Sequence, residues 1–162
     1  MAHQVFFSFH YDRDIPRVEQ IRKSGVVLSP GDTPFGLVDS AEWEGIRKGG
    51  DPAILRWIDG QLQGTSVTVV LIGAETANRQ WVNYEIVESV RRGNGLLGVY
   101  IHNVKDPNGS TTAKGENPFD YVTWGNTHAK LSMTYPTYDW VRDNGRRNLS
   151  RWVDAAAKQA GR

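Results

Sequence analysis

The chain has 162 residues, 39% hydrophobic and 23% charged, which is typical of one soluble globular domain. The absence of cysteine excludes disulfide frameworks, thiolate metal sites and cysteine nucleophiles. A net charge of +1 argues against a dedicated nucleic-acid binder, and no stretch approaches the roughly 20 apolar residues of a membrane span. The first residues lack a secretory-signal pattern, so we expect a cytoplasmic protein that binds neither nucleic acid nor membrane.

The first third of the chain contains patterns for two strands and two helices. A run of β-branched and aromatic residues at 4–10 predicts a buried strand. Asp14, with Pro16 just inside, indicates the start of a helix. Residues 35–39 predict a second, short strand, and the apolar spacing over 51–64 predicts a helix that begins at Asp-Pro and ends at glycine.

The middle of the chain alternates in the same way. The continuous aliphatic run at 66–73 is typical of a central parallel strand buried on both faces. Thr76 or Asn78 is expected to open the next helix, which ends around Gly93. Residues 96–101 predict a fourth strand.

The last third is less regular. Residues 103–120 form a long polar loop, 121–141 show no clear pattern, and a final helix is expected from about Arg146. We expect one domain over residues 1–162, with a core at about 4–122 and a C-terminal elaboration at about 123–162.

Strands that alternate with helices predict an α/β fold, with a central parallel sheet and helices on both faces. Ligands bind such folds beyond the carboxyl ends of the strands, where the strand order reverses. The first strand is normally central, so the residues that leave it, Ser8 to Asp12, are the first place to look for chemistry.

Several common sites are missing from the sequence. Neither GxGxxG after the first strand nor GxxxxGK[ST] occurs, so these phosphate-binding loops are absent. HExxH is also absent, and the four histidines show no metal-ligand spacing. We therefore expect neither a metal nor a bound cofactor.

Glu85 is the most informative single residue. It lies too deep in its helix to cap the start, and its neighbours at helical spacing include no cation. Glu88, by contrast, has arginines three and four residues later. Trp81 falls on the same face as Glu85, which predicts a carboxylate beside an aromatic plane at the rim of the site. The alternative is an ordinary exposed, unpaired glutamate.

The exit of the first strand supplies more polar and aromatic groups. Ser8, Phe9, His10 and Tyr11 offer a hydroxyl, two rings and an imidazole, which suit ring stacking and hydrogen bonds to ribose. The alternative is that Phe9 packs in the core while His10 only caps the strand. At the end of the second predicted strand, Asp39 and Trp43 are expected on the same rim.

These segments resemble a known family. Residues 5–10, VFFSFH, are similar to the first-strand signature of TIR domains, and WVNYE at 81–85 is similar to their WxxxE element. Together with the Phe35–Trp43 segment, TSVTVVLIG and KGENPFDY, they resemble the TIR-like proteins of bacterial Thoeris antiphage systems over most of residues 4–122. The resemblance implies a flavodoxin-like TIR fold.

The resemblance also implies an enzyme whose substrate is NAD. Family members break the nicotinamide–ribose bond and form a cyclic ADP-ribose isomer, which diffuses to a separate effector protein after a phage-derived trigger. Glu85 would then be catalytic. The substrate-binding residues would be Ser8, Phe9, His10, Tyr11, Asp39, Trp43 and Trp81.

The sequence differs from many TIR domains in two respects, and two other functions are alternatives to this interpretation. His10 stands where many TIR domains have arginine, and the region after the fourth strand is unusually long. A non-catalytic TIR scaffold that works by self-association would not need Glu85 beside Trp81. An enzyme like the nucleoside deoxyribosyltransferases would exchange nucleobases with a similar glutamate.

Overall fold

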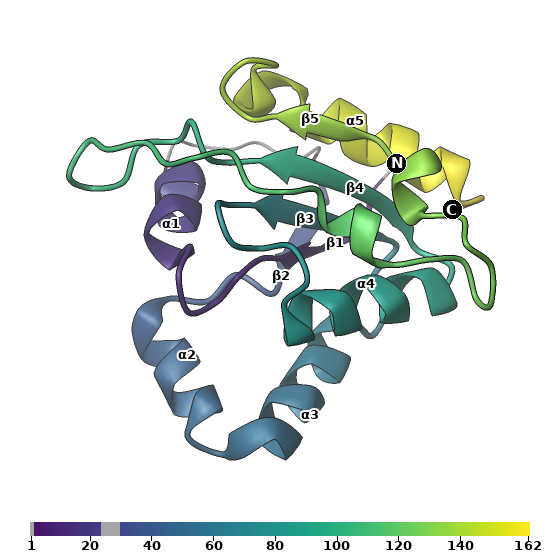
Figure 1. The fold of residues 1–162 in the computed structure, drawn as a ribbon, viewed down its shortest axis with the longest axis horizontal. Helices are drawn as coiled ribbons and strands as arrows, with labels where there is room; N and C mark the ends of the chain where they lie inside the picture. Colours follow the sequence, from purple (N-terminus) through teal and green to yellow (C-terminus); the bar gives the residue numbers. More distant parts are fainter. Residues whose placement is uncertain (1, 24–29) are drawn as a thin grey trace.

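The computed structural model describes residues 2–23 and 30–162, which form a five-stranded sheet in the order β2-β1-β3-β4-β5 (Figure 1). The strands are β1 (Gln4–Ser8), β2 (Thr33–Phe35), β3 (Val67–Ile72), β4 (Gly95–Tyr100) and β5 (Thr137–Asp139). All four pairings are parallel. This strand order is that of flavodoxin-like folds, and it reverses direction between β1 and β3. The predicted parallel sheet is confirmed.

Helices cover both faces of the sheet. They are α1 (Ile15–Lys23), α2 (Ser40–Arg47), α3 (Gly50–Leu62), α4 (Gln80–Arg91) and α5 (Gly145–Gln159). Successive side chains of a strand point to opposite faces. Val69 therefore shares a buried cluster with side chains of α1 and α5, whereas Val70 shares another with side chains of α4. Every residue of β3 is buried, as predicted for a central strand, and every residue of β4 is buried too.

The second strand was misplaced by the sequence pattern: β2 ends at Phe35, where the prediction of 35–39 begins. Gly36 has a φ of +82°, and a Cβ there would lie 2.7 Å from the carbonyl oxygen of Phe7. Its N–H donates to the side chain of Gln61 at 2.9 Å instead of joining the sheet. The chain then enters α2, a helix that the sequence analysis did not predict.

The predicted start of α4 was also wrong, because the helix begins at Gln80. Asn78 is left-handed, with φ +59°, so it cannot belong to the helix. Thr76 is held elsewhere: its hydroxyl accepts from Gly73 N–H at 2.7 Å and donates to Asp14 at 3.2 Å. Both residues lie in the turn that joins β3 to α4.

The segment without a clear pattern adds short elements to the same sheet. A 3₁₀ turn at Pro118–Tyr121 precedes it, and it contains a second at Leu131–Met133 and then β5, which pairs with β4. Helix α5 starts one residue before the expected Arg146 and packs against β4. Figure 1 shows β5 and α5 side by side at one edge of the molecule.

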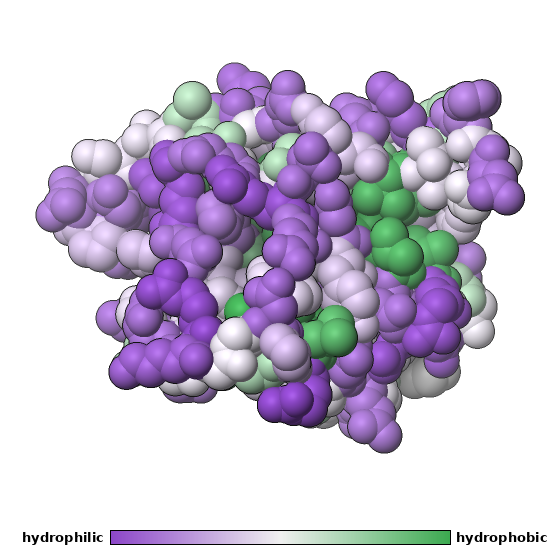
Figure 2. All heavy atoms as spheres, turned by 60° about the horizontal axis from the view of Figure 1, so that its bottom comes forward, coloured by the Kyte–Doolittle hydropathy of each residue, from purple (hydrophilic) through white to green (hydrophobic). Residues whose placement is uncertain are grey.

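None of the helices in the described part of the chain combines the length and apolar character needed to cross a membrane. On the face drawn in Figure 2, hydrophobic residues gather in small groups among hydrophilic ones.

Candidate active site

The carboxyl end of β1 brings the predicted residues together. Ser8 is the last residue of this strand, next to β3 at the point where the strand order reverses. The strand is two residues shorter than predicted, because the chain turns after it: Arg13 and Asp14 donate their backbone N–H groups to the carbonyl of His10. Phe9 to Tyr11 therefore leave the sheet as a short connection over its carboxyl edge.

Glu85 lies beneath this connection, in the second turn of α4, with 0% of its surface exposed. Ser8 Oγ donates a hydrogen bond to one carboxylate oxygen at 2.6 Å, and the Tyr11 hydroxyl donates to the other. The helix is fixed to the sheet behind it, because Ser89 bonds both the Glu85 carbonyl (2.6 Å) and Thr68 of β3 (2.7 Å). The carboxylate is thus held by Ser8 at the end of β1 and Tyr11 in the connection after it, while Thr68 of β3 holds the helix.

The buried position changes the acidity of both groups. Burial raises the pKa of Glu85 from 4.5 to about 8, although the hydrogen bonds from Ser8 and Tyr11 act in the lowering direction. Burial and the neighbouring Glu85 raise the pKa of Tyr11 well above its usual value of 10. Among the described residues, no cation forms an ion pair with Glu85, as its helix neighbours predicted.

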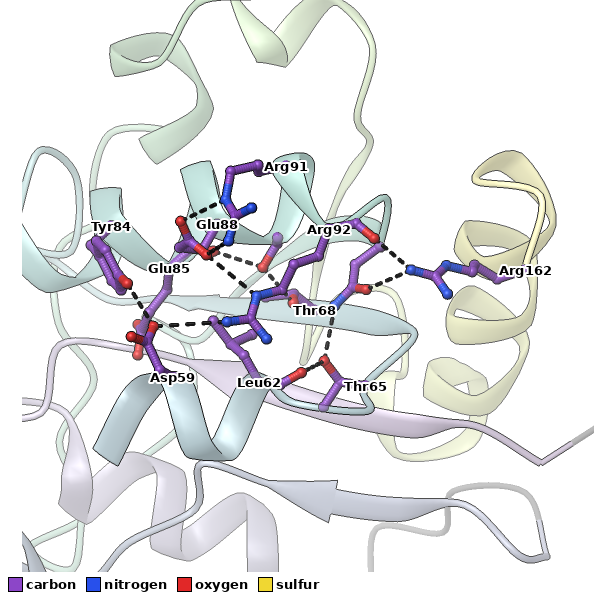
Figure 3. A network of polar contacts seen from close by, with 12 residues as sticks. Asp59, Leu62, Thr65, Thr68, Tyr84, Glu85, Glu88, Arg91, Arg92 and Arg162 are labelled. Carbon is purple, nitrogen blue, oxygen red and sulfur yellow. Dashed lines mark hydrogen bonds and ion pairs between the residues drawn. The ribbon is translucent and has the colours of Figure 1, made fainter. Parts of the chain in front are cut away.

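Glu88, three residues later, is the opposite case. Its carboxylate forms ion pairs with Arg91 at 2.8 Å and Arg92 at 3.3 Å, and these arginines lower its pKa. Arg92 and Tyr84 also reach Asp59 of α3, so this part of α4 is joined to α3 (Figure 3). The distinction that the sequence predicted between the two glutamates is confirmed.

Aromatic rings cover the carboxylate. The ring of Tyr11 stacks on Trp43 at 4.6 Å between centroids and meets Phe9 edge-on at 4.6 Å. Trp57 of α3 packs against Tyr11 from another side at 5.5 Å. The indole N–H of Trp43 donates to Asp12 at 2.8 Å, which fixes the tryptophan over the tyrosine.

A cavity of about 220 Å³ opens above this cover. Its lining combines the end of the β1 connection with the whole first turn of α4: Phe9, His10, Tyr11, Asp12, Trp43, Arg79, Gln80, Trp81 and Val82. Burial lowers the pKa of His10, and Arg79 acts in the same direction. Glu85 is not among the lining residues. Tyr11 touches both the cavity and the carboxylate, and it separates them.

The structure corrects three details of the predicted site. Glu85 is buried below the rim instead of standing on it. The ring against its carboxylate is Tyr11, whereas Trp81 lines the cavity and has Tyr84 as its ring neighbour at 6.3 Å. Asp39 is exposed, and its side chain accepts from Glu42 N–H at 2.8 Å as the N-cap of α2. Its carboxylate therefore serves the helix start.

Two residues of the site were not predicted. Arg79 lines the cavity from the turn before α4, and Trp57 packs on Tyr11 from α3. A basic residue six positions before Glu85, just ahead of its helix, was a usable signal for Arg79. Trp57 gave none, because its contact depends on how α3 packs. Within the described ranges, no three His, Cys, Asp or Glu side chains gather closely enough to hold a metal ion.

Comparison with known proteins places this geometry in a family. A family model described as "Thoeris protein ThsB, TIR-like domain" matches residues 6–106, which include β1 and α4. A protein of Bacillus cereus (strain MSX-D12), named "Putative cyclic ADP-D-ribose synthase ThsB1", is 35% identical over 192 aligned positions. That alignment covers 95% of this chain and all of the Bacillus protein. The chain belongs to the ThsB family of Thoeris proteins with a TIR-like domain.

Proposed function

We propose that this chain cleaves the nicotinamide–ribose bond of NAD and closes the remaining ADP-ribose into a cyclic isomer. The single observation that carries the proposal is the buried Glu85, held by Ser8 and Tyr11 under a cavity at the carboxyl end of the central strand. The name of the Bacillus relative, a cyclic ADP-D-ribose synthase, supports the choice of product class.

In the proposed reaction, the bond between the ribose carbon and the nicotinamide nitrogen breaks, and both electrons leave with nicotinamide. Positive charge develops on the ribose as an oxocarbenium-like centre, which a nearby carboxylate stabilises. Glu85 is the carboxylate that we assign to this role, because it lies directly below the cavity. Tyr11, which separates the two, must move aside before the ribose hydroxyls can replace those of Ser8 and Tyr11 on the carboxylate. No metal is needed for this step.

Ring closure requires a nucleophile from the same molecule. A ring nitrogen or a hydroxyl of ADP-ribose forms the new bond to the ribose carbon, and a hydroxyl loses its proton to Glu85. Water must be kept away until then. The rings of Phe9, Tyr11, Trp43 and Trp81 around the cavity supply apolar walls for this purpose. Because burial raises the pKa of Glu85 to about 8, the ionised form that this reaction uses becomes populated as the pH rises toward 8.

The cyclic product would act as a diffusible messenger to a separate effector, and a phage-derived signal would start the reaction. Both steps come from the family resemblance. Self-association of a catalytically inactive module is the competing function, and it leaves the buried carboxylate without a use.

The test compares wild type, Glu85→Gln and Glu88→Gln with NAD, each as purified protein and in lysate from phage-infected cells. Chromatography with mass detection follows nicotinamide and the nucleotide products. We expect wild type and Glu88→Gln to release nicotinamide and a cyclic ADP-ribose isomer, and Glu85→Gln to lose about 10²-fold or more of this activity.

Three other results would contradict the proposal. No nicotinamide release in infected lysate would favour the scaffold. Exchange of one nucleobase for another would favour a deoxyribosyltransferase-like enzyme. Release of linear ADP-ribose alone would make the protein a hydrolase.

A further inference from the structure

The cavity over Glu85 is too small for the whole substrate. Pockets that enclose drug-sized ligands measure about 300–1,000 Å³, and this cavity has about 220 Å³. A dinucleotide such as NAD is at least as large as those ligands. If the nicotinamide ribose lies over Glu85, the ADP half must lie outside this cavity.

A second cavity of about 550 Å³ adjoins the first, and Arg79 lines both. It lies between the turn before α4 and the loop before the first 3₁₀ turn, and its lining is Ala74, Glu75, Ala77, Asn78, Arg79, Lys114, Gly115, Glu116 and Tyr121. The two walls touch at Gly115, where a Cβ would lie 2.1 Å from the carbonyl oxygen of Gly73. The loop is therefore fixed against the turn, and the cavity is a built feature of the fold.

Arg79, which lines both cavities, shares its carboxylate partner with a second arginine. The Arg79 guanidinium bonds the Glu75 carboxylate at 3.0 Å, and Arg13 pairs with the same carboxylate. One carboxylate thus serves two arginines, so Arg79 can turn to an anion while Glu75 keeps Arg13. No side-chain hydrogen bond caps the start of α4, and residues of its first turn line the first cavity. The helix dipole adds to the attraction for a diphosphate there.

The far side of the second cavity offers an aromatic surface. Tyr121 is 45% exposed, and its hydroxyl is held by Glu116, which leaves the ring accessible. Bases stack on such rings. Lys114 adds a further cation, its ammonium 4.5 Å above the ring of Tyr100.

A third cavity, of about 250 Å³, adjoins the first on its other side and is the competing place for the ADP half. It is less suited to an anion. Both of its arginines are paired: Arg47 with Glu44 at 2.7 Å and Asp12 at 3.5 Å, and Arg13 with Glu75. Its aromatic rings, Tyr11 and Trp43, are 3% and 4% exposed, so neither presents a face to a base.

We propose that Arg79 and the first turn of α4 bind the diphosphate of NAD, and that Tyr121 stacks on its adenine in the second cavity. The assignment rests on the proposed function for its substrate. In the bound orientation that it predicts, the nicotinamide end lies over Glu85, the diphosphate lies at Arg79 and the adenine lies at Tyr121.

The test measures binding of ADP and of adenosine by calorimetry to wild type, Arg79→Gln, Tyr121→Ala, Tyr121→Phe and Arg47→Gln. Arg79→Gln is expected to weaken ADP at least about tenfold and adenosine little, because it removes the charge that contacts phosphate. Tyr121→Ala is expected to weaken both ligands by about tenfold, the order of one stacked base. Tyr121→Phe keeps the ring and should bind like wild type, as should Arg47→Gln.

The proposal is overturned if ADP fails to bind wild type at millimolar concentration, or if Arg47→Gln weakens ADP while Arg79→Gln does not. It is also overturned if Tyr121→Ala binds ADP as wild type does. ADP binding tests this site and NAD turnover, which Glu85→Gln is expected to lose, tests the proposed function, so the two can fail separately. ADP binding that depends on Arg79 but comes with no NAD turnover would support the site and reject the reaction.

Discussion

The two halves of α4 carry two glutamates in opposite surroundings. Glu85, in the half under the cavity, has only hydroxyl partners and is fully buried, with a raised pKa. Glu88, in the half next to α3, is held by Arg91 and Arg92, with a lowered pKa (Figure 3). Three residues along one helix therefore separate a carboxylate suited to chemistry from one that joins two helices. The difference lies in the partners, since the residue type and the helix are the same.

The aromatic cover belongs to the Glu85 half, and its removal gives the largest expected loss of stability. Trp43→Ala deletes a buried indole that stacks on Tyr11 and donates to Asp12. We expect the free energy of unfolding to fall by about 3–5 kcal/mol, measured by urea denaturation. Trp81→Ala is the matched control, because Trp81 is only half-buried, and it should cost about 1–2 kcal/mol. Equal losses would mean that the cover is not held together by Trp43.

The contrast in pKa predicts a pH dependence of stability. The folded state raises the pKa of Glu85 from 4.5 to about 8, so between these values the folded protein binds a proton that the unfolded chain has lost. Stability therefore falls as pH rises through this window and levels off above it. We expect wild type to lose a few kcal/mol between pH 5.5 and pH 8.5.

Two variants test whether Glu85 causes this fall of stability with pH. Glu85→Gln should remove it, because the amide does not titrate, and should be more stable than wild type at pH 8.5. Glu88→Gln should keep it, because Glu88 has a lowered pKa and stays charged in both states throughout the window. An unchanged slope in Glu85→Gln would show that the carboxylate is not buried in solution.

The contrast between the glutamates could be predicted from the sequence because it depends on local spacing. One helix is enough to show both features. Arginines follow Glu88 three and four residues later, and no cation lies at helical spacing from Glu85. The parallel sheet was equally accessible, since the runs at 66–73 and 96–101 are almost wholly apolar. These features follow from short-range patterns, which tertiary contacts here reinforce.

What could not be predicted depends on contacts between distant segments. The end of β2 is set by Gly36 against Phe7, and the start of α4 by Thr76 bound to Gly73 and Asp14. β5 has only three residues and pairs with β4 across a long irregular segment, so its sequence is too short to predict a strand. The choice of Tyr11 over Trp81 as the ring on Glu85 also depends on how the β1 connection folds back.

The hydroxyl of Tyr11 provides a smaller perturbation inside the Glu85 half. Tyr11→Phe keeps the stacked ring but removes one hydrogen bond to the buried carboxylate. We expect a loss of about 1–2 kcal/mol at pH 7. Because that hydrogen bond lowers the pKa of Glu85, its loss should also move the end of the stability slope to a pH above about 8.

The matched change on the other half is Tyr84→Phe, which removes a hydroxyl bond of 2.5 Å to Asp59. It should leave the stability slope of Glu85 where it is in wild type. A shift of equal size in both variants would mean that the slope reports a general loosening of α4.

The smallest effect is expected from the Glu88 half itself. Glu88→Gln removes ion pairs to Arg91, which is 66% exposed, and to Arg92, which is 26% exposed. Such pairs contribute little, so we expect a loss of less than about 1 kcal/mol that shrinks further in 1 M salt. NAD turnover should remain that of wild type, because these side chains face α3 and not the cavity. A large loss of turnover in Glu88→Gln would show that the joint between α4 and α3 positions Glu85, and the two halves would then act as one unit.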